Sequence, residues 1–219
     1  MERKMSFVLL VCALAATAAR ADLYNFECIT NNSAVDAAIG ESQFSVLVTS
    51  GGTTQDGREQ VLFEFQNAGP AASSITDVYF YDGALLDYGD VSLTPSGGVS
   101  YSEGADPGSL PGWPQPEIYA TRVFSADSLP AVQPNGINPG ESLGVLFALA
   151  SGTTFQDVIN GLNGGITDPM TAGNITIGIR AQGFADGGSE SFVHAPLPGA
   201  VLLGLLGLGV AGLKLRKLV

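Results

Sequence analysis

Basic residues are scarce in the central part of this chain. Of its nine lysines and arginines, six lie near the two ends, and only Arg58, Arg122 and Arg180 fall between residues 22 and 195. The same stretch holds 20 of the 21 acidic residues, so its formal charge is −17. A surface of this sign cannot neutralise a run of phosphates, which excludes nucleic acid as a partner. It favours solubility, divalent cations or basic partners.

Histidine and cysteine are almost absent. Cys28 is the only cysteine beyond the first 21 residues, so an internal disulfide is excluded; the thiol is either buried or paired with another molecule. The only histidine, His194, lies where we expect the chain to leave the folded domain, which makes a Cys28–His194 catalytic dyad a poor prospect. Gly-x-Ser-x-Gly, His-Glu-x-x-His and Cys-x-x-Cys motifs are also missing. The sequence therefore lacks the motifs that supply the catalytic groups of common hydrolases and the ligands of transition-metal sites.

The first 21 residues have the pattern of a secretory signal peptide. Arg3 and Lys4 precede an apolar stretch over residues 7–19, and Ala19 and Ala21 form a small-x-small cleavage pattern. The apolar stretch is too short to span a membrane, which takes about 20 residues. We expect cleavage after Ala21, so that the exported domain covers residues 22–194.

A second apolar run lies near the C-terminus. Pro196, Leu197 and Pro198 lead into residues 199–213, and the basic residues Lys214, Arg216 and Lys217 follow. The run is short for a membrane span, but the flanking prolines and the snorkelling basic side chains extend its reach. We predict a transmembrane helix here, with the basic residues on the cytoplasmic side and the acidic domain outside.

Between these segments, apolar and polar residues alternate with the period of two that half-buried strands require. Turn sequences rich in Gly, Asn, Asp and Pro separate the runs. The predicted fold is all-β: an antiparallel β-sandwich of jelly-roll or Ig-like type, with one short helix. The expected strands cover residues 23–30, 44–49, 61–66, 75–81, 90–94, 143–149, 175–180 and 189–193.

Two segments depart from the strand pattern. Thr154 is placed to cap a helix over residues 154–162, which Gly164 and Gly165 would end. Residues 104–117 hold four prolines around Trp113 and predict a long loop. Trp113 itself is either a plug over an open end of the sandwich or a platform on which a sugar stacks.

Carboxylates are abundant enough to suggest two kinds of site. Asp82, Asp87 and Asp90 flank a predicted turn and offer oxygen ligands to Ca²⁺, as do Asp186 and Glu190, although neither group has EF-hand spacing. The alternative for each group is an acidic turn exposed to water. A glycosidase needs only two suitably placed carboxylates, so that activity also stays open.

The C-terminal segment resembles a known export signal. A Pro-x-Pro motif, a Gly-rich apolar run and a terminal basic cluster are similar to the PEP-CTERM sorting signals of Gram-negative bacteria, with Leu197 in place of the usual glutamate. The resemblance covers residues 195–219. It implies an exosortase-type membrane protease or transpeptidase as partner, transient anchoring in the inner membrane, cleavage near residues 196–199 and release to the cell surface or extracellular matrix.

Three functions remain open from the sequence. The favoured one is a non-enzymatic cell-surface or extracellular-matrix protein, without a cofactor, that contacts exopolysaccharide. The second is a secreted carbohydrate-active enzyme that uses two carboxylates. The third is an adhesion module stabilised by Ca²⁺, suggested by the strongly acidic domain.

Overall fold

The computed structural model describes residues 21–82, 84–113, 122–169 and 171–196. Antiparallel strands dominate this part of the chain, and three helices connect some of them. In chain order the elements are β1 (Ala21–Cys28), α1 (Ala34–Gln43), β2 (Phe44–Thr53), β3 (Glu59–Asn67), β4 (Ser74–Asp82), β5 (Leu86–Pro95), β6 (Tyr101–Glu103), β7 (Arg122–Ser128), α2 (Val132–Asn135), β8 (Ser142–Leu149), α3 (Phe155–Thr167), β9 (Ile175–Gln182) and β10 (Ser189–Ala195).

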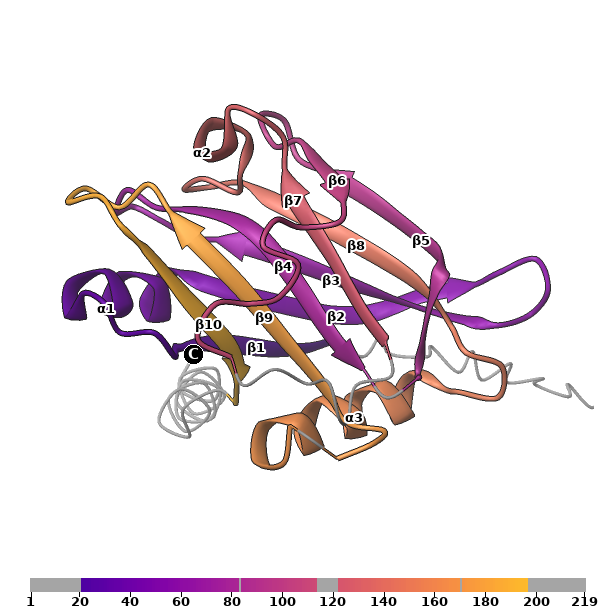
Figure 1. Cartoon of the computed structure of the whole chain (residues 1–219). Helices are drawn as coiled ribbons and strands as arrows, with labels where there is room; N and C mark the ends of the chain where they lie inside the picture. Colours follow the sequence, from indigo (N-terminus) through magenta and orange to yellow (C-terminus); the bar gives the residue numbers. More distant parts are fainter. Residues whose placement is uncertain (1–20, 83, 114–121, 170, 197–219) are drawn as a thin grey trace, which may run out of the picture.

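All ten strands belong to one sheet in the order β5-β8-β3-β2-β1-β10-β9-β4-β7-β6. The sheet curls until its two halves face each other as a nearly closed cylinder (Figure 1). Ring contacts between the halves show this directly. Phe63 of β3 lies 4.9 Å from Phe80 of β4, and Phe124 of β7 lies 5.0 Å from Phe147 of β8, measured between ring centroids. The apolar residue of each alternating pair therefore faces a shared core, and the polar residue faces outward.

The antiparallel β character predicted from the sequence is confirmed, and each of the eight expected strands is present. The expected division into two separate sheets is wrong, because β1 and β10 pair with each other and join the two halves. Two further strands, β6 and β7, were not expected. β7 escapes the alternation pattern because its inward residues include only two apolar side chains, Phe124 and Ala126.

Helix α3 begins at the predicted cap. The Thr154 side chain accepts a hydrogen bond from the Asp157 N–H, and the Asp157 carboxylate accepts one from the Thr154 N–H, which completes a capping box. The expected end at Gly164 and Gly165 is wrong, since the helix continues to Thr167. A Cβ at Gly165 would lie 2.0 Å from the Ile175 carbonyl oxygen. This glycine therefore permits close packing of the helix on β9 instead of terminating it.

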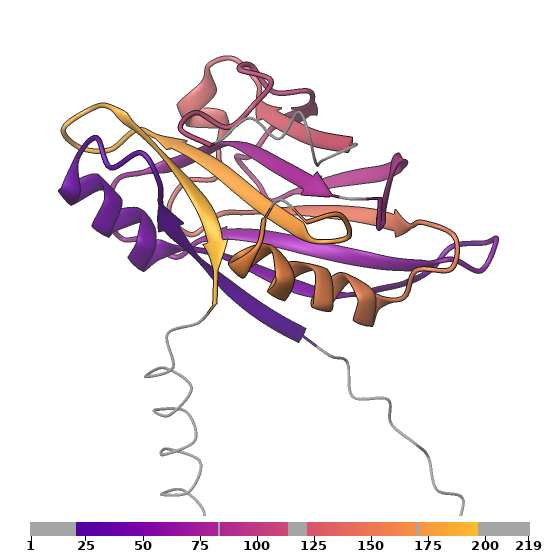
Figure 2. The same ribbon diagram turned by 60° about the horizontal axis from the view of Figure 1, so that its bottom comes forward.

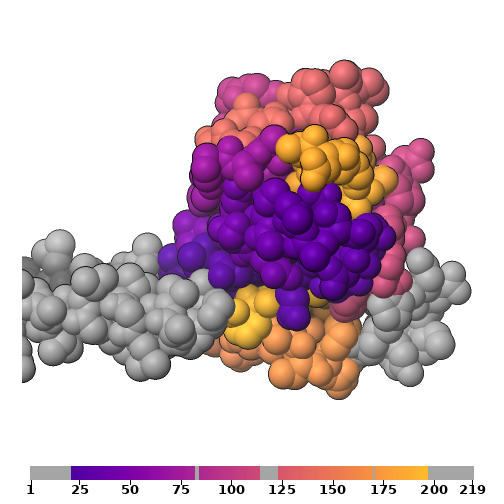
Figure 3. Space-filling view, turned by 90° about the vertical axis from the view of Figure 1, so that its left-hand side faces the viewer, coloured from indigo at the N-terminus to yellow at the C-terminus, as the bar shows by residue number. Residues whose placement is uncertain are grey.

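Two helices lie outside the sequence prediction. α1, capped by Ser33, covers one end of the curled sheet (Figure 3). Its Gly40 lies directly against the core, because a Cβ there would meet the Phe192 ring at 2.2 Å. α2 is a single turn without a side-chain cap. The prediction of one short helix in the domain is corrected to three among the described residues.

Both ends of the described domain leave from the same side. β1 and β10 are antiparallel neighbours, with Asn25 opposite Ala195, and the chain enters and leaves beside α3 (Figure 2). No helix among the described residues is long and apolar enough to cross a membrane. The predicted transmembrane run, residues 199–213, lies outside the described residues.

Candidate functional site

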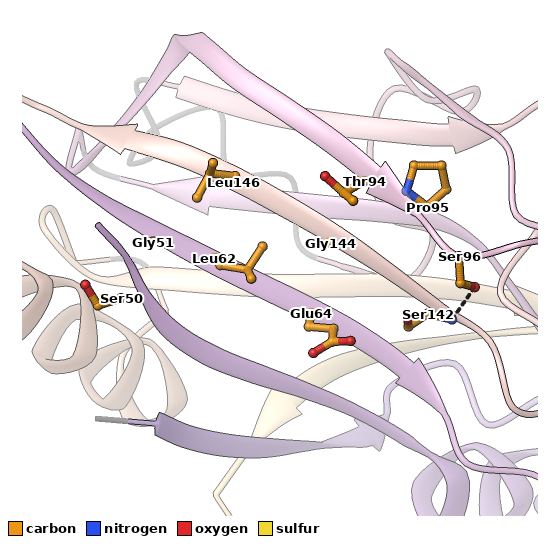
Figure 4. Close-up of a pocket in the computed structure, with 10 residues that line it drawn as sticks. All are labelled: Ser50, Gly51, Leu62, Glu64, Thr94, Pro95, Ser96, Ser142, Gly144 and Leu146. Carbon is orange, nitrogen blue, oxygen red and sulfur yellow. Dashed lines mark hydrogen bonds between the residues drawn. The ribbon is translucent and has the colours of Figure 1, made fainter. Parts of the chain in front are cut away.

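An open groove lies on the outer face of the sheet half formed by β2, β3, β8 and β5 (Figure 4). Its volume is about 550 Å³, which falls in the range of about 300–1,000 Å³ found for small-molecule sites. None of the described lining residues belongs to a helix. The lining residues are Ser50, Gly51, Leu62, Glu64, Thr94, Pro95, Ser96, Ser142, Gly144 and Leu146.

Gly144 forms the floor of the groove. The strand register places Glu64 of β3 on one side of this glycine and Thr94 of β5 on the other. Because glycine has no side chain, the two neighbours stand across a gap. A Cβ at residue 144 would lie 3.3 Å from Leu62 Cδ1 and 3.5 Å from the Thr94 carbonyl oxygen. A larger residue here would therefore fill the hollow.

The polarity of the side chains that line the groove changes along its length. At one end Ser96 and Ser142 are joined by two hydrogen bonds: the Ser142 N–H donates to Ser96 Oγ at 2.9 Å, and the Ser96 N–H donates to the Ser142 carbonyl at 2.9 Å. Toward the other end Leu62 and Leu146 form a cross-strand pair. The surface thus offers hydroxyl groups beside an apolar patch, a mixture of polar and apolar lining that is typical of ligand sites.

Glu64 is the only charged side chain among the described residues that line the groove. No hydrogen bond or ion pair engages its carboxylate within the described part of the chain. A glycosidase needs a second carboxyl group about 5–9.5 Å away in the same cleft, and the described lining contains none. Among the described lining residues, Glu64 therefore has no second carboxylate with which to form such a pair.

A second polar cluster lies on the outer face of the other sheet half. Thr76 is an extra residue in β4, where the pairing with β9 shifts between Ile75 and Asp77. This bulge turns Asp77 outward, opposite Arg180 of β9 and Asp127 of β7. Asp77 is only 1% exposed. Its Oδ2 accepts a hydrogen bond from the Thr76 hydroxyl at 2.7 Å.

Burial changes the titration of this cluster. It raises the pKa of Asp77 to about 6; the Thr76 hydrogen bond and the Arg180 charge oppose the rise, and the Asp127 charge adds to it. Burial also raises the pKa of Asp127. The Tyr79 hydroxyl lies 3.4 Å from Asp77 Oδ1, and burial raises its pKa as well. Shifted carboxylates of this kind mark candidate active sites, although structural networks shift pKa values too.

The proline-rich loop covers this cluster, and in residues 104–113 it contains neither helix nor strand, as predicted. The Tyr79 hydroxyl donates to the Pro107 carbonyl at 2.8 Å, and the Leu110 N–H donates to the Tyr81 hydroxyl at 2.8 Å. Trp113 stacks on Tyr81 with ring centroids 6.3 Å apart. Trp113 therefore packs on the outer face of β4, whereas the sequence suggested a plug over an open end or a platform for a sugar.

His194 is a structural residue. It lies inside β10, not in a departing stalk, and both ring nitrogens contact the main chain: Nδ1 accepts from the Ile177 N–H at 3.1 Å, and Nε2 lies 3.0 Å from the Leu162 carbonyl. This geometry requires the neutral ring with its proton on Nε2. Burial lowers the pKa of His194 to about 4. The ring joins β10, β9 and α3 and has no nitrogen left for a Cys28 dyad.

Cys28 is half-buried and unpaired with any other cysteine. Its Sγ lies 3.5 Å from the Glu190 carboxylate, and burial raises the pKa of the thiol, so the thiol is not activated. Glu190 accepts hydrogen bonds from the Asn32 N–H at 3.0 Å and the Ser33 N–H at 2.6 Å. Burial acts to raise the pKa of Glu190, but the hydrogen bond from the Thr30 hydroxyl and these two bonds hold it below the usual value. This carboxylate secures the turn between β1 and α1.

The proposed calcium ligands Asp87 and Asp90 lie around a guanidinium group. Arg58 donates to Asp87 at 2.7 Å, to Asp90 at 2.8 Å and to Asp56 at 2.9 Å. Asp82 ends β4, and its side chain lies outside the described part. Among the described residues no group of three or more His, Cys, Asp or Glu side chains is arranged to hold a metal ion.

The structure describes two of the residues that were predicted to belong to export signals. Ala21 is the first residue of β1, and Pro196, the last described residue, lines a hollow of about 350 Å³ with Asn25 and Glu41 among its neighbours. The remaining residues predicted for processing lie outside the described part: Ala19, Leu197, Pro198, Lys214, Arg216 and Lys217.

Comparison with known proteins gives no family or relative. No family model, no curated protein and no solved structure has a significant match to the chain. Function must therefore be argued from the residues themselves.

Sequence reasoning missed both polar sites. The Glu64–Gly144–Thr94 row depends on the register of three strands that are distant in the sequence. The position of Asp77 on the outer face depends on the bulge at Thr76. Of these residues, only Gly144 stood out in the sequence. A glycine inside an otherwise apolar strand often marks a place where a ligand or another backbone comes close.

Proposed function

We propose that this chain is an exported, non-enzymatic cell-surface or extracellular-matrix protein that contacts polysaccharide through the outer groove. The observation that carries the proposal is the groove itself: an uncovered hollow of about 550 Å³ with hydroxyl groups at one end, an apolar pair toward the other and a single carboxylate. Chains of sugar rings offer hydroxyl edges and apolar C–H faces, which match this lining.

The position of the chain ends supports tethering. β1 and β10 carry the two ends of the domain and neither contributes a residue to the groove, which is built on β2, β3, β5 and β8 and the turn after β5. Anchoring through residues 199–213 as a transmembrane helix would therefore leave the groove free. The resemblance of residues 195–219 to PEP-CTERM signals supports transient retention in the inner membrane, processing by an exosortase-type enzyme and release.

The alternative of a carbohydrate-active enzyme has less support. The groove offers one carboxylate, and the carboxylates that the strand register places opposite each other, Asp77 and Asp127, lie beneath residues 104–113 with Asp77 almost fully buried. A substrate would have to displace the packed loop before it reached them.

Mass spectrometry of the protein recovered from its native host tests the export proposal. We expect an N-terminus at Asp22 and a C-terminus near Pro198. An intact Val219 would indicate a plain membrane anchor and refute the sorting interpretation. A retained Met1 would refute export through a cleaved signal.

A further inference from the structure

The charge of the groove indicates which class of polysaccharide it binds. The one charged side chain in its described lining is Glu64, and residues 22–195 together carry a formal charge of −17. An acidic polymer would be repelled by both. A polymer with positive groups would be attracted over a distance of about a Debye length, roughly 8 Å at physiological salt.

The arginine side chains that the structure describes are already engaged elsewhere. Arg58 is bound by Asp56, Asp87 and Asp90, and Arg180 lies opposite Asp77 on the other sheet half. Within the described part, no basic side chain lines the groove or compensates Glu64. A ligand that carries a positive group would therefore be the first basic partner of Glu64 within the described part of the chain.

We propose that the groove binds a polysaccharide whose sugars carry free amino groups, with the ammonium group at the Glu64 carboxylate. This inference rests on the proposed function and names the ligand class for the same groove. Ser96, Ser142 and Thr94 supply hydroxyls for the ring substituents, and Leu62 with Leu146 supplies an apolar surface for a ring face. Gly144 leaves the space in which the amino group meets the carboxylate.

A cationic peptide is the competing ligand, and the lining favours the sugar. Ser50, Thr94, Ser96 and Ser142 give the groove four hydroxyl side chains against one carboxylate. Hydroxyls both donate and accept hydrogen bonds, as sugar hydroxyls do. A lysine side chain has one ammonium group and no hydroxyl, so it would use the carboxylate but would not match the four hydroxyl side chains as a sugar ring does.

Binding of the full chain in detergent to defined oligomers tests the inference. The probes are a glucosamine pentamer, its fully N-acetylated form, a galacturonic acid pentamer and pentalysine, titrated calorimetrically at mildly acid pH, where the sugar amines are protonated. We expect the glucosamine pentamer to bind about tenfold tighter than the N-acetylated form, because a charge-assisted hydrogen bond replaces a neutral one. Galacturonate should not bind.

A matched pair of variants locates the interaction. Glu64→Gln removes the carboxylate with little change of shape and should reduce affinity for the glucosamine pentamer about tenfold, to the level of the N-acetylated form. Asp186→Asn removes the same charge from the exposed turn between β9 and β10, on the other sheet half, and should leave binding unchanged. Affinity should also fall as salt rises from about 20 to 200 mM, a measurement that needs no variant.

The outcomes separate the inference from the proposed function. Equal affinity for both glucosamine forms, or a Glu64→Gln variant that binds like the parent, overturns the amino-sugar inference and leaves polysaccharide binding intact. Binding of none of the sugars overturns both. Pentalysine binding as tightly as the glucosamine pentamer, and lost equally in Glu64→Gln, shows that the groove responds to charge alone and overturns the sugar class.

Discussion

Replacing Asp77 by asparagine should make this protein more stable at neutral pH. The parent holds a carboxylate that is 1% exposed, and burial raises its pKa from 3.8 to about 6. Between these two values the folded state binds more protons than the unfolded state, so stability falls as pH rises through the window. Above about pH 6 the full cost of the buried charge is present. The asparagine side chain carries no charge, and its amide oxygen can still accept the Thr76 hydrogen bond.

The magnitude follows from the two pKa values. At 1.36 kcal/mol per pKa unit, the difference between 3.8 and about 6 corresponds to about 3 kcal/mol. His194 acts in the opposite sense, because its pKa is lowered from 6.5 to about 4 and the unfolded state takes up the proton first. Stability contributed by neutral His194 is lost as pH falls through that window. In the parent the two slopes largely cancel between about pH 4 and 6.

Urea unfolding at a series of pH values measures the effect. Unfolding is monitored by far-UV circular dichroism and by the fluorescence of Trp113, the only tryptophan in the sequence. We expect the Asp77→Asn variant to gain up to about 3 kcal/mol above pH 7 and to equal the parent near pH 4. As pH falls between those values the variant should lose stability steeply, because the His194 slope is now unopposed. A variant curve parallel to the parent curve at all pH values would refute the assignment of the pH dependence to Asp77.

Three further predictions concern other parts of the fold. Thr154→Ala should reduce the free energy of unfolding by about 1 kcal/mol through loss of the capping box, and Thr154→Ser should retain most of it; an unchanged urea midpoint in the alanine variant would contradict this. Phe63→Ala, at a fully buried ring, should cost about 3–5 kcal/mol, and a loss below about 1 kcal/mol would mean that the two sheet halves do not pack there. Neither Ca²⁺ nor EDTA should shift the melting temperature, since Arg58 already binds Asp87 and Asp90; a rise with Ca²⁺ would favour the adhesion module.

The strands were predictable because the alternation is local. Val61, Phe63 and Phe65 occupy every second position of β3, and the same period holds in β2, β8 and β9. The cap of α3 was equally local, since Thr154 and Asp157 are three residues apart. The curling of the sheet could not be predicted. It depends on the pairing of β1 with β10, which lies at the opposite end of the domain sequence, and no local sequence pattern reports that pairing.

Glycine was the residue type whose role the sequence concealed most. In α1, Gly40 lowers the apparent helical tendency, yet it lies where the Phe192 ring leaves no room for a side chain. In α3, Gly165 occurs where a break was expected and instead allows contact with the Ile175 carbonyl. Gly144 opens the groove. In each case the missing side chain matters because of a neighbour that is distant in the sequence.

The pairing of β1 with β10 determines how the domain responds to mechanical load. Pulling residues 21 and 195 apart would unzip the two strands, because both ends lie at the same side and their hydrogen bonds would break one after another. A pull on residue 195 along the strand axis, resisted by a ligand held on β3 and β8, would instead load the β10 ladders with β1 and β9 in shear, with many bonds bearing force together. Under the proposed tethering through β10, tension between an anchor and a ligand in the groove would therefore load the domain in this shear direction.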